Sequence, residues 1–312
     1  MTMMVSPIIS RYKELNTPLE TCMNQSEFSR RSIRKLFYGV LVLFSTQIAI
    51  AEPIHAERII SVDSNATEIL LALGVGSKII ATDITSEPLL KGENIQILGY
   101  HRTLSAEALL SLQPDLIVGS DHTGPAATVN AIQQAQINFI QLDSPESVAE
   151  LSRNIHRLAK SLNREATGQA LIDDIQQLEN AIVSKQNGSA LNMVFLLDLN
   201  DRGLSQAGRD TVGNALITLL HGENVSNFNG FQTVSLESIL AINPDVIIVG
   251  KRINGAPEKE QLLARYTLLK NTAAGQAQRI VSVDASKLIA GLSITAVNQA
   301  NQLAEIIFPS AR

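Results

Sequence analysis

The chain contains a single cysteine and no tryptophan. The cysteine, Cys22, lies in an N-terminal segment whose pattern predicts removal during export. The exported chain would then have no thiol, no disulfide and no thiolate ligand for a metal. It would also have no cysteine to carry a lipid, so a free periplasmic protein is favoured over a lipid-tethered one.

Long hydrophobic runs are also scarce. The longest, Leu36 to Ile50, is too short for a membrane span and follows the basic residues Arg30, Arg31, Arg34 and Lys35. Ala49-Ile50-Ala51 has the small residues of a signal-peptidase site. We expect residues 1–51 to be an N-terminal extension and signal peptide cleaved near Ala51, with Met23 as an alternative start. Arg30-Arg31 also resembles a twin-arginine signal, although ordinary secretion is favoured.

Positive charge is low. Residues 1–51 hold six of the 25 basic and three of the 30 acidic residues, so the remainder has a net charge of −8. That charge argues against nucleic acid as a partner. Zinc-type ligand spacing, a GxSxG elbow, a phosphate loop and a dinucleotide fingerprint are all missing. The sequence therefore predicts a protein that is not an enzyme.

The main positive feature of the sequence is an internal repeat. Leu104–Ser120 (LSAEALLSLQPDLIVGS) and Val234–Gly250 (VSLESILAINPDVIIVG) share six of 17 positions. Each copy predicts a short amphipathic helix with an early glutamate, a Pro-Asp turn and an apolar strand. Strands that are apolar throughout are typical of parallel sheets covered by helices on both faces. Two similar α/β lobes with a ligand between them are therefore expected.

The rest of the pattern divides the chain. Strands are predicted at residues 58–62, 78–82, 138–142, 193–197 and 279–283, and Asn65 and Glu68 have the spacing of a capping box. Residues 146–185 have helical spacing with a break expected near Asn163. We predict an α/β protein of two Rossmann-like lobes with parallel sheets, joined by a single long helix. The N-terminal lobe would span residues 52–163, the linker helix 164–187 and the C-terminal lobe 188–312.

Ligands of parallel α/β sheets bind beyond the carboxyl ends of the strands. This rule nominates the four stretches Ser64-Asn65, Asp121 to Gly124 (with His122), Asp198 to Arg202, and Gly250-Lys251-Arg252. Among the histidines, only His122 falls in such a stretch, and a structural role is favoured over ligation.

Tyr100 lies in the glycine-led loop before the first repeat, whereas the second repeat has Phe231 at the comparable place. A phenol has a pKa near 10, and the neighbouring Arg102 would favour its anion. Phenolate oxygen is a known axial ligand of haem iron. An ordinary half-exposed loop tyrosine is the alternative. His101 could substitute as ligand, but adjacent loop side chains diverge, and we expect His101 to face solvent.

Three stretches, LGYHRTLSAEALLSLQPDLIVGS, QAGRDTVGNALITLLHGENV and ESILAINPDVIIVG, resemble the haem-binding periplasmic proteins of bacterial haem ABC importers, the HmuT-like group. This group belongs to the helix-linked (class III) substrate-binding proteins, which also carry cobalamin and ferric siderophores. The resemblance covers residues 56–309. It implies haem as the transported ligand, Tyr100 as axial ligand of its iron, and support from Arg102 and His101.

The resemblance also implies further roles. Some members have a second histidine ligand where this chain has Leu199 or Asn200, so a second protein ligand is not implied. Arg209 and Arg252, by charge and location, are candidates to meet the propionates. Glu107 and Glu237 match the acidic residues that pair with arginines of the two permease subunits. The expected partners are an inner-membrane ABC permease dimer and its ATPase, with the carrier a monomer.

Two alternatives stay open. A ferric siderophore or cobalamin could be the cargo of the same fold, although the absence of tryptophan and the few aromatic residues do not favour cobalamin. An exported haem-processing enzyme is the second alternative, and it lacks a recognisable catalytic set.

Overall fold

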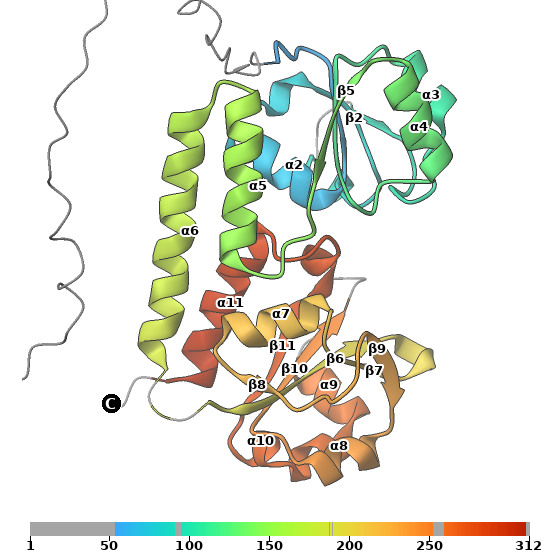
Figure 1. The fold of residues 1–312 in the computed structure, drawn as a ribbon. Coiled ribbons are helices and arrows are strands. Elements are labelled where there is room, and N and C mark those ends of the chain that lie inside the picture. Colours follow the sequence, from blue (N-terminus) through green and yellow to red (C-terminus); the bar gives the residue numbers. More distant parts are fainter. Residues whose placement is uncertain (1–53, 91–94, 187, 189, 252–258, 310–312) are drawn as a thin grey trace, which may run out of the picture. The chain divides into compact units, whose positions relative to one another are not determined.

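A computed structural model describes residues 54–90, 95–186, 188, 190–251 and 259–309. The chain divides into two units, Met1–Ala51 and Glu52–Arg312. The predicted signal peptide lies outside the described residues. The second unit contains two β-sheets with helices packed on them (Figure 1).

The first sheet is parallel throughout. Its strand order is β3-β2-β1-β4-β5, so the direction of chain winding reverses between β1 and β4. The strands are β1 (Ile59–Val62), β2 (Ile79–Thr82), β3 (Gln96–Ile97), β4 (Leu116–Ser120) and β5 (Asn138–Leu142). Such a reversal leaves a crevice beyond the carboxyl ends of β1 and β4, where ligands of open α/β sheets bind.

The second sheet is mixed. Its order is β11-β10-β6-β7-β9, with β8 also paired to β6. The strands are β6 (Asn192–Asp198), β7 (Leu204–Ala207), β8 (Glu223–Asn224), β9 (Phe231–Val234), β10 (Val246–Lys251) and β11 (Ile280–Asp284). β7 runs antiparallel to both of its neighbours, β6 and β9, so the prediction of a parallel second sheet is wrong at this edge. The connection from Asp198 to Leu204 is too short for the crossover that a parallel pair needs.

Helices follow most strands and confirm the predicted α/β class. They are α2 (Ser64–Ala72), α3 (Ala106–Ser111), α4 (Ala126–Gln134), α5 (Val148–Ser161), α6 (Glu165–Lys185), α7 (Val212–Leu219), α8 (Leu236–Ile242), α9 (Lys259–Arg265), α10 (Ala273–Gln276) and α11 (Ile294–Ile307). Short 3₁₀ turns cover Gly76–Lys78, Glu87–Leu89, Asn200–Arg202, Thr267–Asn271 and Ala285–Leu288.

Successive residues of the central strands enter different cores, as the apolar runs predict. In β1, Ile59 joins the core that holds α2 and α5, whereas Ile60 joins the core that holds Leu109 of α3 and Ile132 of α4. β6 repeats this alternation, because Phe195 and Val194 face different clusters. Both faces of each sheet are therefore buried, which explains why the strands carry no polar alternation.

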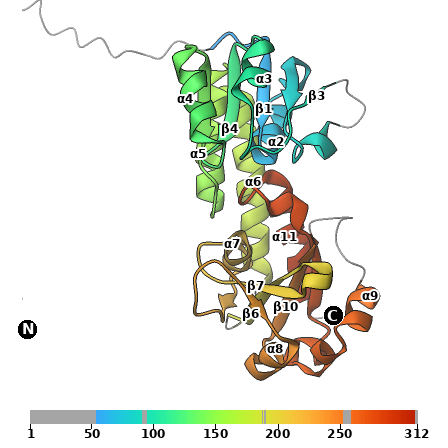
Figure 2. The ribbon, with the colours of Figure 1, turned by 90° about the vertical axis from the view of Figure 1, so that its right-hand side faces the viewer.

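The helical segment after β5 breaks where the sequence predicts. α5 ends at Ser161, and Asn163 adopts a positive φ of 55°, which asparagine tolerates at a helix C-terminus. α6 lies beside α5 and also beside α11 (Figures 1 and 2). One apolar cluster runs through α5, α6 and α11 and reaches both sheets. α6 falls inside residues 164–187, although the exact lobe boundaries stay a prediction.

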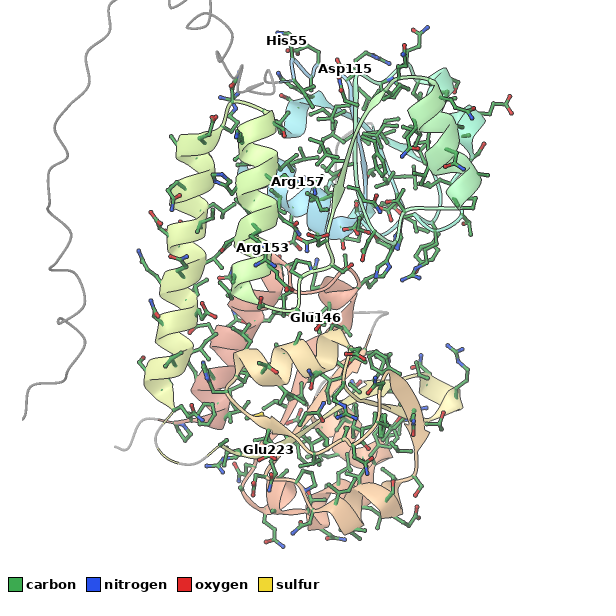
Figure 3. All side chains as sticks on the ribbon, viewed as in Figure 1. His55, Asp115, Glu146, Arg153, Arg157 and Glu223 are labelled. Atoms are coloured by element: carbon green, nitrogen blue, oxygen red, sulfur yellow. The ribbon has the colours of Figure 1, made fainter. Side chains whose placement is uncertain are left out.

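The two repeat copies share a structural device. Ser105 and Ser235 each cap a helix, accepting a hydrogen bond from the backbone N–H three residues on. The Asp115 carboxylate accepts hydrogen bonds from the backbone N–H groups just before β1, and Asp245 accepts one from Asn192 at the start of β6 (Asp115 is labelled in Figure 3). The Pro-Asp turn therefore ties each repeat strand to the first strand of its sheet.

In the part of the chain that the structure describes, we find no helix with the length and apolarity to span a membrane.

Candidate functional site

The carboxyl ends of β1 and β2 each carry a buried aspartate. Asp63 follows β1 and begins α2, since its carboxylate accepts hydrogen bonds from Asn65 N at 2.7 Å and Ala66 N at 3.3 Å. The predicted capping box of Asn65 and Glu68 is therefore wrong, because Asp63 performs the capping. Asp83 follows β2, is fully buried, and accepts a hydrogen bond from Asp63 N at 3.0 Å.

Asn65 and Glu68 instead contact the chain ahead of α11. Asn65 Nδ2 donates to the carbonyl oxygens of Ala290 and Leu292 at 3.3 and 3.2 Å. Glu68 accepts from Ser293 Oγ at 3.2 Å and from Thr295 N at 2.9 Å, at the N-terminus of α11. These bonds join residues more than 220 positions apart in the sequence, so neighbouring residues give no signal for them.

A cavity of about 380 Å³ lies beside these contacts. It is lined by Ser64, Glu68, Ile84, Thr85, Pro88, Leu89, Ser286, Lys287 and Ile289. The lining therefore comes from helix α2, from the segment after β2 and from the turn after β11. Apolar atoms supply most of the surface of this lining, and the carboxylate of Glu68 and the amine of Lys287 add charge. A mostly apolar wall with few polar groups is typical of a small-molecule site.

The loop that carries Tyr100 adjoins this cavity. Ile84, which lines the cavity and is 52% exposed, donates its backbone N–H to the Gly99 carbonyl at 2.8 Å. Gly99 has a φ of 92°, a conformation that glycine adopts without strain. The Tyr100 carbonyl accepts from Thr103 N at 2.9 Å, and the Tyr100 side chain is 41% exposed. The loop backbone is thus held while the phenol stays accessible.

The expectation that His101 faces solvent is wrong. Its side chain is buried, and its Nδ1 lies 3.0 Å from Asp83 Oδ2. Burial alone would raise the pKa of Asp83, but hydrogen bonds from His101, Thr85 and Ser86 outweigh it and hold that pKa below its ordinary value. A buried imidazole bonded to this carboxylate is badly placed to bind iron.

Asp63 is under both electrostatic and backbone strain. Burial raises the pKa of its carboxyl to about 6, and the nearby Ser120 hydroxyl and the hydrogen bonds from Asn65 N and Ala66 N only partly offset this effect. Its Oδ2 has no hydrogen-bond partner among the described residues. Its φ of 132° lies in a region that non-glycine residues rarely adopt. Strain of this kind gathers at functional sites.

The loop after β4 also reaches the Tyr100 loop. Gly124 N donates to the His101 carbonyl at 2.9 Å, and Leu104 N donates to the Gly124 carbonyl at 2.9 Å. His122 is part-buried in this loop. Burial lowers its pKa; the nearby Asp121 opposes this and the positive charge of Arg102 adds to it. Arg102 itself is exposed. The structure therefore places the loop of Tyr100 and Arg102 next to the loop of His122.

The other predicted stretches lie on the second sheet. Asp198 is buried and accepts hydrogen bonds from Tyr266 Oη at 2.9 Å and Asn200 N at 2.8 Å. Arg209 Nε donates to Asn229 Oδ1 at 3.2 Å, which directs its guanidinium toward the loop before β9. Arg252 lies outside the described residues. Phe231 is 39% exposed but stands in β9, so it is no loop counterpart of Tyr100.

Glu107 and Glu237 occupy matching places. Each lies in the first turn of its repeat helix, α3 or α8, and each is exposed. Hydrogen bonds from its own backbone N–H and from the Ser235 hydroxyl lower the pKa of Glu237. Negative charge in a first helical turn also complements the helix dipole.

No group of three or more His, Cys, Asp or Glu side chains among the described residues could enclose a metal ion. The arrangement can instead supply one exposed oxygen donor, Tyr100, to a metal that arrives with other ligands of its own. The second described tyrosine, Tyr266, is buried.

The sequence analysis missed Asp63 and Asp83 as parts of the site. The available signal was an aspartate directly after each of two predicted apolar strands, at Val62-Asp63 and Thr82-Asp83. Both positions fall at the sheet edge that the ligand rule nominates.

Two helix-covered β-sheets, a cavity near the strand ends and the accessible phenol oxygen of Tyr100 are typical of a two-lobed ligand-binding protein. A family model described as "Periplasmic binding protein" matches residues 59–286, and the chain belongs to this family. Members of this family are periplasmic or lipid-tethered binding proteins of ABC transporters.

Solved structures and curated relatives differ in their ligands. The chain is 31% identical to the periplasmic heme-binding protein HutB of Vibrio cholerae, with a TM-score of 0.71 over 81% of this chain and 99% of that one. It is 25% identical to the heme-binding protein RhuT of Roseiflexus, with a TM-score of 0.68 over 82% and 100% of the chains. A vitamin B12-binding protein of Vibrio cholerae is 28% identical over 67% of this chain and 76% of its own length.

Proposed function

We propose that this protein is a periplasmic carrier that binds haem through Tyr100 and delivers it to an inner-membrane ABC permease with its ATPase. The proposal rests mainly on one observation: the Tyr100 phenol is accessible on a loop whose backbone is hydrogen bonded on both sides. The other described tyrosine is buried against Asp198. Phenolate is a haem axial ligand in known proteins, and the porphyrin nitrogens already supply all the equatorial donors. The similarity to HutB supports this choice.

The surroundings of Tyr100 suit haem. Ile84 and Tyr100 are both exposed next to a mostly apolar cavity, which would cover part of a flat apolar ring. Arg102, two residues after Tyr100, would stabilise the phenolate by its charge. Arg209 and Arg252 remain the proposed propionate partners, with His122, Ser64 and Asn65 around the cleft. The buried His101 would support the Tyr100 ring and would not itself bind the iron.

Docking to the permease would use Glu107 and Glu237. Both are exposed at the start of equivalent helices, and such a related pair suits a permease dimer with two-fold symmetry. Exposed ion pairs contribute about 1 kcal/mol or less each, so they would set orientation more than affinity.

Cobalamin is the second candidate, because a relative described as a vitamin B12-binding protein is 28% identical to this chain. Cobalamin carries its own lower ligand, so it would not need the Tyr100 oxygen. A ferric siderophore likewise brings its own oxygen donors. In both cases, removal of the Tyr100 hydroxyl would cost little affinity.

Titration with hemin tests the proposal. The wild-type protein should bind hemin and show the absorption of a ferric high-spin iron with a tyrosinate ligand. Tyr100→Phe should abolish that absorption and weaken binding. Tyr266→Phe is the matched control, since it removes a phenol hydroxyl that is buried near Asp198 and should leave the spectrum unchanged.

Parallel titrations with cyanocobalamin and a ferric catecholate siderophore separate the alternatives. Binding of either compound with equal affinity in wild type and Tyr100→Phe, together with no hemin binding, would contradict the haem proposal and support the corresponding alternative.

A further inference from the structure

Tyr100 and His101 are neighbours in one loop, and the side chain of His101 is anchored. His101 is 1% exposed and Asp83 is fully buried, and their side chains are joined at 3.0 Å. The His101 ring lies against the Tyr100 ring, with 4.3 Å between centroids and 47° between planes. The buried imidazole is therefore the side chain that the accessible phenol rests on.

Asp83 is itself tightly held. Its Oδ1 accepts hydrogen bonds from Asp63 N at 3.0 Å and Ser86 Oγ at 2.7 Å. Its Oδ2 accepts from Thr85 Oγ1 at 2.6 Å and Thr85 N at 3.2 Å, in addition to His101. Since these partners come from the ends of β1 and β2, the carboxylate has little freedom to move. An acceptor surrounded by donors also fixes the imidazole tautomer, with the proton on Nδ1.

The imidazole orientation is thus tied to the sheet, and the phenol orientation is tied to the imidazole. The backbone alone does not fix the phenol, because its bonds at Gly99, Tyr100 and His101 restrain the main chain but leave side-chain rotation free. A side chain that the Asp83 hydrogen bond anchors beneath the phenol restricts that rotation, whereas an unanchored side chain is free to move away. Ligands that are held in place by supporting residues bind metals better than ligands that must be ordered on binding.

We propose that His101, held by Asp83, is a positioning residue that directs the Tyr100 phenol toward the incoming ligand. This inference rests on the proposed function for its ligand, but the orientation of Tyr100 can be measured without any ligand. The chain contains no tryptophan and four tyrosines. Replacing Tyr12, Tyr38 and Tyr266 by phenylalanine leaves Tyr100 as the only tyrosine in the full-length chain.

Two substitutions separate the hydrogen bond from the ring. His101→Phe keeps an aromatic ring but has no donor for Asp83. His101→Asn loses the ring but places an amide N–H near the position of Nδ1. If the hydrogen bond positions Tyr100, His101→Phe should lower hemin affinity about tenfold, the size of one lost hydrogen bond to a charged group, and alter the tyrosinate absorption. His101→Asn should recover most of both.

Asn154→Ala is the control for general destabilisation. Asn154 is buried near the same sheet and bonds the backbone of Asp143, away from the Tyr100 loop. Urea unfolding of each variant gives its stability. Loss of hemin affinity in Asn154→Ala equal to that in His101→Phe, or equal losses in both His101 variants, would overturn the positioning role.

Fluorescence anisotropy of Tyr100 in the single-tyrosine chain, without hemin, is the second measurement. It should fall in His101→Phe and recover in His101→Asn, and unchanged anisotropy in His101→Phe would overturn the inference. If the wild type binds no hemin but anisotropy follows this order, the haem proposal fails while the positioning role stands.

Discussion

Replacing Asp63 with asparagine should stabilise the protein at neutral pH and change how its stability depends on pH. Asp63 is 1% exposed, one of its carboxylate oxygens has no hydrogen-bond partner among the described residues, and burial raises its pKa to about 6. Asparagine has nearly the same shape as aspartate and keeps an oxygen to cap α2. It also removes the buried charge.

The magnitude follows from linkage. The folded-state pKa of about 6 lies above the ordinary value of 3.8. The folded state therefore holds a proton that the unfolded state has released, and stability falls as pH rises through this window. One pKa unit corresponds to about 1.4 kcal/mol, so the full loss is about 3 kcal/mol above pH 6. Between pH 4.5 and 7.5 the loss is about 2 kcal/mol.

Urea unfolding at pH 4.5 and 7.5 measures the difference in unfolding free energy between wild type and Asp63→Asn. This difference should shift by about 2 kcal/mol in favour of the variant at the higher pH, because pH-independent effects of the substitution cancel. Asp174→Asn, at an exposed position of α6, should show no such shift. A constant difference for Asp63→Asn, or a shift in the opposite direction, would refute the assigned burial penalty.

Three further changes test packing and contacts by urea unfolding at pH 7.5. Phe195→Ala should cost about 3–5 kcal/mol, because this fully buried ring fills the core of the second sheet, and a cost under about 1 kcal/mol would contradict that packing. Gly119→Ala should cost about 1–3 kcal/mol, since its new Cβ would clash with Thr123 Oγ1 and lie 2.8 Å from Val62 Cγ2; equal stability would mean that these neighbours move aside easily. Glu68→Ala should cost about 1–2 kcal/mol through loss of the Thr295 N–H bond, whereas Glu68→Gln should retain most of it; equal losses would point to charge as the cause.

Local pattern determined much of the fold. Apolar runs predicted the central strands, and the repeat predicted two equivalent helix-turn-strand units, because burial on both faces needs apolar residues at successive positions. The helix break at Asn163 was also predicted, since a polar residue that tolerates positive φ ends a helix. The strands β7 and β9 were missed, because each is four residues long with two polar residues in the middle, so neither forms an apolar run.

The features of the candidate site also divide into those that the sequence determined and those that only the tertiary structure decided. The sequence by itself determined that Tyr100 stands in a glycine-led loop beside Arg102, and that polar residues follow the strands where a ligand would bind. Only the tertiary structure decided that His101 turns inward to Asp83 and that Glu68 reaches α11. A strand or helix period is set by neighbours in the chain, whereas these hydrogen bonds join residues 18 and 227 positions apart, and either partner alone looks like an ordinary polar residue.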